Sequence, residues 1–170
     1  MQKQMMAASL AILITLSGCV VTGNNFGLNA VRGEGELVSR TYPVEAYTSV
    51  EIYGGYTIVY TAEPSQELVI EMQENLLEHV SVTVTDGRLV VDSDKTLFPG
   101  INASPVLELA TPELKEREVH GAIDMKQADP IVGDRFELTV SGACDVDITL
   151  QTKEVLIDSS GASTVILQGS

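Results

Sequence analysis

The chain has 170 residues, of which 24 are acidic and 10 are basic, so its formal net charge at pH 7 is -14. This charge argues against nucleic acid as a partner, because binding to phosphates requires a surface rich in lysine and arginine. The length suits one domain of ordinary size rather than several.

The first eighteen residues have the pattern of a secretory signal. Lys3 is the only charged residue among the first 31, and an apolar run over residues 5–16 follows it. A membrane-spanning helix needs about 20 apolar residues. The run is too short for that, and it predicts the apolar region of a signal peptide over residues 1–18.

The run ends in Leu-Ser-Gly-Cys at residues 16–19, which resembles a bacterial lipobox. The resemblance implies cleavage between Gly18 and Cys19 and acylation of the Cys19 thiol. Two or more acyl chains anchor a protein stably, whereas one chain is marginal. Cys19 is therefore predicted to attach the protein to a membrane, and Cys144 then has no partner for an internal disulfide.

Glycines and asparagines are interleaved after this cysteine, over residues 20–36, without strand or helix periodicity. Such a composition favours a flexible chain. We predict a tether over residues 19–36 and a folded domain over residues 37–170. An ordered first strand is the alternative for the end of the tether, because alternation begins at Leu37.

The domain is predicted to consist almost entirely of strands. Apolar residues alternate with polar ones over residues 50–52, 68–72 and 80–84. Asp86-Gly87 between two alternating runs predicts a hairpin. Residues 71–79 look helical but are few, so we expect a single turn or a bend there.

Four segments with a glycine corner can be aligned with one another. The aligned glycines are Gly54, Gly121, Gly142 and Gly161. Units of about twenty residues built from strands and corners predict a right-handed β-solenoid, whose coils bury their interior by stacking; a β-sandwich is the alternative. We expect the glycines to serve the structure, at tight bends or close backbone approaches.

The two-residue period of these strands points Cys144 inward, as an inert core residue, and points Asp124 and Asp145 outward. Stacked carboxylates could bind a cation, but Thr57 and Thr164 replace the acid in the other two segments. We therefore interpret the aspartates as partners of the turn backbone. No metal site and no cofactor is predicted.

No catalytic site is predicted either. The only histidines are His79 and His120, and no motif for a serine hydrolase, a zinc protease or a phosphate loop is present. A β-helix enzyme acting on polysaccharide is less favoured, because the five arginines are scattered.

The order of these features resembles a bacterial family, described as putative auto-transporter adhesin, head GIN domain. The resemblance extends over about residues 40–167, and it rests on the lipobox, the glycine-rich spacer and three stretches that read RTYPVEAYTSVEIYGGYTIVYT, ENLLEHVSVTVTDGRLVV and SGACDVDITL. The family corner reads Ser-Gly-Ser-Gly-Asp-Val, whereas Cys144 and Ser163 stand at the position of the second glycine here. The resemblance implies a β-solenoid on the cell envelope and no established activity.

Two functions are compatible with these observations. One is a binding or adhesion module displayed from the lipid anchor, which meets glycan or protein through acidic strand faces and exposed tyrosines among Tyr42, Tyr47, Tyr53, Tyr56 and Tyr60. The other is a structural envelope or periplasmic scaffold that docks a protein partner. An aspartate directly after the acylated cysteine is associated with retention at the inner membrane. Val20 stands at this position, which favours the outer membrane.

The last residues, 168–170, follow a predicted strand directly, whereas family members usually continue through further repeats. We expect an uncapped edge that self-associates or binds a partner, or else a truncated sequence.

Overall fold

The computed structural model describes residues 29–101 and 103–169. The predicted signal peptide, the predicted cleavage site after Gly18, the predicted acylation at Cys19 and the predicted tether up to residue 28 lie outside these residues. Within them, no helix has the length and the apolar character needed to cross a membrane.

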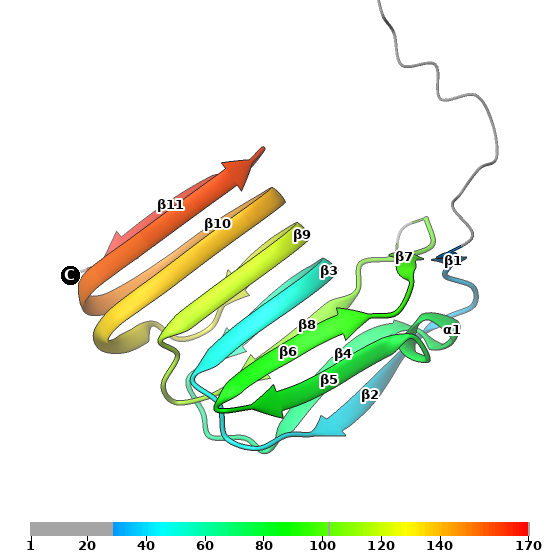
Figure 1. Cartoon of the computed structure of the whole chain (residues 1–170), viewed down its shortest axis with the longest axis horizontal. Helices are drawn as coiled ribbons and strands as arrows, with labels where there is room; N and C mark the ends of the chain where they lie inside the picture. The colour runs from blue at the N-terminus through cyan, green and yellow to red at the C-terminus, as the bar shows by residue number, and fades with distance from the viewer. Residues whose placement is uncertain (1–28, 102, 170) are drawn as a thin grey trace, which may run out of the picture.

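The described residues form strands and one short helix (Figure 1). The elements are β1 (Ala30–Arg32), β2 (Leu37–Pro43), β3 (Ser49–Thr61), β4 (Glu67–Gln73), α1 (Glu74–Leu77), β5 (Val80–Thr85), β6 (Arg88–Ser93), β7 (Thr96–Phe98), β8 (Val106–Ala110), β9 (Glu116–Gln127), β10 (Ile131–Gly161) and β11 (Thr164–Gly169). The predicted all-β class is correct, and α1 is the single turn expected within residues 71–79. β1 lies within the range predicted as a tether, where it pairs with β7.

β3 is the central strand of a nine-stranded mixed sheet. The order is β11-β10-β9-β3-β8-β4-β2, with β6 also paired with β3 and β5 paired with β6. Along one edge β3 pairs with β9 from Ser49 to Tyr60, whereas along the other its first half pairs with β6 and its second half with β8. The sheet therefore divides at the middle of β3 into two facing halves.

The division falls at the glycines. Gly54, Gly121, Gly142 and Gly161 all have positive φ, between 98° and 133°. Gly54 is paired with Gly121, and Gly121 with Gly142, so the bends of successive strands lie over one another. A Cβ on Gly121 would come closer than 3.0 Å to the carbonyl oxygen of Gly54. Each strand can turn the corner because glycine tolerates both this φ and this approach.

The predicted β-solenoid is wrong. Among the described residues no closed coil forms, because the chain between β3 and β9 builds antiparallel pairs instead of another coil: β4 pairs with β2 and β8, and β5 pairs with β6. Residues 62–115 therefore do not follow the predicted repeat of about twenty residues. Two halves of a sheet that face each other across a core are closer to a β-sandwich, which was the alternative.

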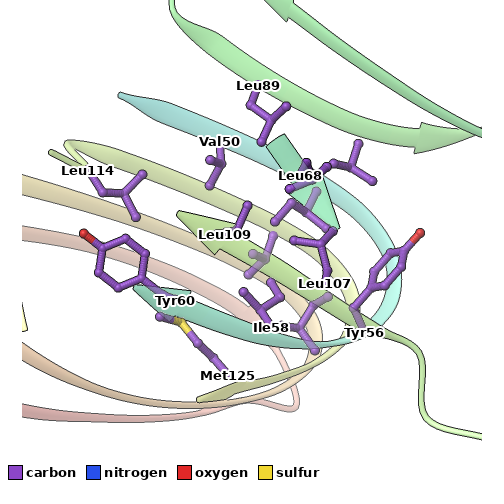
Figure 2. Close-up of a cluster of buried hydrophobic side chains, with 14 of the residues drawn as sticks. Val50, Tyr56, Ile58, Tyr60, Leu68, Leu89, Leu107, Leu109, Leu114 and Met125 are labelled. Atoms are coloured by element: carbon purple, nitrogen blue, oxygen red, sulfur yellow. The ribbon is translucent and has the colours of Figure 1, made fainter. Parts of the chain in front are cut away.

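The core fills the space between the two halves (Figure 2). Leu89 of β6 lies on one side, and Ile58 of β3 with Leu107 of β8 on the other; all three are fully buried. Tyr56 and Tyr60 lie at opposite ends of the cluster shown. The inward position predicted for Cys144 is correct, since its side chain is buried.

The predicted hairpin is confirmed. Asp86 and Gly87 form a two-residue connection between β5 and β6, with φ of 52° and 76°. Two positive φ values are the signature of a type I′ turn, whose twist matches that of the strands it joins. The hairpin brings β6 against the first half of β3, and this contact helps to form the site below.

Candidate binding surface

The outer surface of the first half of the sheet carries a compact group of polar side chains. Because Val50 and Ile52 of β3 point into the core, Glu51 and Tyr53 point out. The register places Glu51 beside Glu118 of β9, and Tyr53 beside His120. On the other side of β3, β6 adds Arg88, which lies beside Ser49. We call Glu51, Tyr53, Arg88, Glu116, Glu118 and His120 the outer patch.

Arg88 is the centre of the charges in the outer patch. Its guanidinium nitrogens lie 2.8 Å from a carboxylate oxygen of Glu116 and 3.4 Å from those of Glu51 and Glu118. Desolvation acts to lower the pKa of Arg88, but the three carboxylates outweigh it, and the pKa is raised. One cation thus faces three anions, so the patch stays acidic.

Tyr53 and His120 form an aromatic pair at the end of the outer patch nearest the glycine corner. Their ring centroids are 4.7 Å apart and their planes are inclined by 14°, so the rings are stacked. The Tyr53 hydroxyl donates a hydrogen bond to Glu51, which raises the pKa of this tyrosine. Tyr53 remains 36% exposed, so the patch presents an oriented aromatic ring to solvent.

A hollow adjoins each end of the outer patch. Beyond Tyr53, a groove of about 450 Å³ runs along the corner, lined by Gly54, Tyr56, Leu97 and Pro99 among others. Beyond Glu116, an open cleft of about 480 Å³ is lined mainly by charged residues of both signs, which are Glu113, Lys115, Glu116, Asp134, Arg135 and Glu137. Together these features make one continuous surface with an aromatic, an acidic and a mixed-charge part.

Glu51, Glu118 and His120 could also be considered as metal ligands, since their ligand atoms lie within 4.8 Å of one another. The guanidinium of Arg88 is, however, 3.4 Å from the carboxylates of both Glu51 and Glu118. The chain itself supplies the cation that neutralises them. The arrangement suits the recognition of a ligand better than the binding of a metal.

The predicted site residues outside the outer patch have other surroundings. Asp124 and Asp145 are paired neighbours on β9 and β10, and both are exposed. Asp124 lies 3.9 Å from Lys126. We expected both carboxylates to accept hydrogen bonds from turn amides. Within the described part of the chain neither does, because both residues lie within strands whose backbone groups are already paired.

The tyrosines are less available than predicted. Tyr47, Tyr56 and Tyr60 are buried, and Tyr42 is half-buried. The hydroxyls of Tyr47 and Tyr60 donate hydrogen bonds to the carbonyl oxygens of Ala110 and Thr111, respectively. Of the five tyrosines, Tyr53 is the exposed one. A binding face could therefore use one tyrosine ring, rather than the several that we had expected.

Sequence reasoning missed most of the outer patch. The alignment of Gly54 with Gly121 already placed Tyr53 beside His120, one residue before each glycine, so this pair could have been found. The position of Arg88 next to these residues could not have been found from the sequence, because it depends on how the hairpin packs against β3.

Three crystal structures have similar folds. A protein described as a putative adhesin from Parabacteroides merdae is 16% identical with a TM-score of 0.69, and covers 82% of this chain. A putative adhesin from Bacteroides fragilis is 20% identical with a TM-score of 0.68, and covers 79%. A putative lipid-binding protein from Parabacteroides distasonis is 17% identical with a TM-score of 0.59, and covers 83%. These identities show a shared fold alone.

The chain spans 59%, 63% and 69% of the lengths of these three proteins, respectively. No curated protein matches it. The family model described as putative auto-transporter adhesin, head GIN domain, matches residues 46–170. The chain therefore belongs to this family, as its sequence features had indicated.

Proposed function

We propose that this protein is a non-enzymatic binding module of the bacterial cell envelope, and that it recognises its ligand through the outer patch. Family membership supports an adhesin-like role. The single observation that carries the proposal is the exposed Tyr53 ring, held by a stack on His120 and by a hydrogen bond to Glu51. A ring fixed in this way loses little conformational entropy on binding.

The chemistry of the outer patch suggests the class of ligand. Carboxylates accept hydrogen bonds from hydroxyl and ammonium groups, and an aromatic ring packs against the apolar face of a sugar. The surplus of carboxylates would repel an acidic polysaccharide. The ligand that fits best is a neutral or amino-sugar glycan, and the corner groove offers space for its less polar part.

A glycan array with the purified protein tests this assignment. We expect neutral or amino-sugar glycans to bind, and Tyr53→Ala to lose at least about tenfold in affinity, in the range of a residue that contributes strongly to an interface. Tyr53→Phe keeps the ring and removes the hydroxyl. Thr83→Ala, at an exposed position of β5, is the control. Equal binding by Tyr53→Ala and the control would contradict the proposal.

We also propose that the module is held at the envelope by a lipid on Cys19, with the outer membrane as the expected site. Protease treatment of intact cells, with Cys19→Ala to test the anchor, examines both points. Cleavage from intact cells is expected for an outward-facing adhesin, together with release of Cys19→Ala from the membrane fraction. Protection until the envelope is opened would instead support a periplasmic scaffold that docks a protein partner.

A further inference from the structure

The aromatic pair of the outer patch leaves one ring face free on the side of β10. His120 lies on β9, between Tyr53 of β3 and Ser141 of β10. One face of its ring is covered by Tyr53, with 4.7 Å between the ring centroids. The other face therefore points away from β3, towards β10. The His120 side chain is 31% exposed, so a ligand can reach this face.

Two hydroxyl groups lie beside the free face of His120. Ser141 is paired with His120, and Thr139 with Glu118. Because Val140 between them points into the core, Thr139 and Ser141 point to the same outer surface as the outer patch. Neither hydroxyl has a hydrogen-bond partner among the described residues, and neither is sealed from solvent. Both are therefore available to a ligand.

The opposite side of the aromatic pair, towards β6 and β5, offers less. The neighbour of Glu51 on β6 is the apolar Val90, which separates Glu51 from Thr83 of β5. The hydroxyl of Ser81 on β5 already donates a hydrogen bond to the backbone carbonyl of Asp92, at 3.4 Å. A sugar chain that continues from Tyr53 thus finds its free hydrogen-bonding groups in the direction of β10.

The distance across these strands sets the length of the ligand. β3, β9 and β10 lie side by side (Figure 1). Neighbouring strands are about 4.8 Å apart, so the backbones at Tyr53 and Ser141 are separated by roughly 10 Å. One sugar ring is too small to contact both residues, whereas an extended chain of a few sugars is long enough. Glu118, between them, accepts hydrogen bonds from sugar hydroxyl or amino groups.

We propose that the binding surface continues across β10, where the free face of His120 and the hydroxyls of Thr139 and Ser141 form a second sugar position. The ligand is accordingly an extended oligosaccharide of neutral or amino sugars, and its chain crosses the strands from β3 towards β10. This inference rests on the function proposed above, to which it adds the length and the direction of the ligand. His120 then supports the Tyr53 ring with one face and packs against a sugar with the other.

A series of sugars of increasing length tests the inference with the purified full chain. Glucose, cellobiose and cellotetraose are the neutral probes, and glucosamine with its β-1,4-linked dimer and tetramer are the amino-sugar probes. Competition binding measures each affinity. From one sugar to four, we expect the affinity of wild type to rise at least about tenfold in one series or both, as two added hydrogen bonds would give. No gain with length in either series would overturn the inference.

Removing the two hydroxyls locates the second position. Thr139→Ala combined with Ser141→Ala should bind the single sugar as wild type does, and should keep less than about threefold of the gain with length. Ser81→Ala combined with Thr83→Ala removes the same two kinds of hydroxyl from β5 and is the matched control, in which the full gain is expected. An unchanged gain in the β10 variant, or an equal loss in the control, would count against the second position.

Tyr53→Ala separates this inference from the proposed function. It should weaken the binding of every probe, the single sugar included. If wild type binds none of the probes and no glycan on the array, the proposed function fails and the inference fails with it. If binding depends on Tyr53 but not on chain length or on the β10 hydroxyls, the proposed function stands and the inference alone is wrong.

Discussion

Arg117 is the residue whose position is hardest to reconcile with stability. Its side chain is completely buried on the inward face of β9. One Nη donates to the sulfur of Met125, and the guanidinium lies 5.7 Å from the centre of the Tyr60 ring. Nε and the other Nη have no hydrogen-bond partner among the described residues. Desolvation lowers the pKa of Arg117 to about 10, so the core is an unfavourable place for this charge.

We therefore expect Arg117→Met to stabilise the protein. Methionine fills a similar volume and needs no counter-ion, and replacing buried charges with apolar residues can stabilise a protein by about 1 to 4 kcal/mol. Urea unfolding at pH 7 gives the free energy of unfolding. Arg135→Met, which removes an exposed arginine, should change it by less than about 1 kcal/mol. A clear loss of stability in Arg117→Met would show that the buried cation has a structural role.

Tyr47 should make the fold sensitive to alkaline pH. Burial raises its pKa to about 12 from the ordinary 10.0. A tyrosine whose pKa is raised on folding contributes stability that is complete below pH 10 and is lost as the pH rises towards 12. The shift corresponds to about 3 kcal/mol.

This contribution is measured by comparing wild type with Tyr47→Phe in urea at pH 8 and at pH 11.5. The variant should lose less stability on going to the higher pH. Arg117 acts in the opposite direction over this range, since its pKa is lowered, but it is present in both proteins. Thr83→Ala, which removes no titratable group from an exposed position, should keep the pH dependence of wild type. Identical pH dependence of wild type and Tyr47→Phe would contradict the assignment.

At the level of the strands, the glycine corner should tolerate no side chain. Gly142 combines a φ of 127° with a close approach to the carbonyl of Gly121. Gly142→Ala should cost more than about 3 kcal/mol, or prevent folding, because strain in φ and a backbone clash act together. Gly87 has a φ of 76° but nothing within 4 Å of an added Cβ. Gly87→Ala should therefore cost only about 1 to 2 kcal/mol. Comparable unfolding free energies for the two variants would argue against the clash.

The strands also show what the sequence can and cannot predict. The hairpin at Asp86-Gly87 follows from local turn chemistry, and alignment of the glycines reproduces the register of β3, β9 and β10. The order of the sheet does not follow, because β3 divides its second edge between β6 and β8. That choice depends on contacts between segments distant in sequence. Arg88 was absent from the predicted site for the same reason, since its place beside β3 depends on contacts between distant segments.

For the whole molecule, the division of partners around β3 predicts slow folding. β3 must find β6, β8 and β9, and only the last of these, the farthest along the chain, pairs with it from Ser49 to Tyr60. Proteins dominated by pairings distant in sequence fold in milliseconds to seconds. We expect refolding after dilution from urea to take roughly 0.1 s or longer by stopped-flow fluorescence of the buried tyrosines. Refolding within microseconds would show that the order of assembly is more local than the topology implies.

Because β3 runs without a break through both halves of the sheet, neither half can swing away from the other. Motions that open a cleft between two rigid bodies need a hinge of a few residues that few contacts restrain. In this sheet a hinge would have to lie at the glycine corner, where pairing with neighbouring strands restrains the backbone. The outer patch should therefore have nearly the same shape before and after a ligand arrives, so that association would be a single docking step whose rate does not level off as ligand concentration rises.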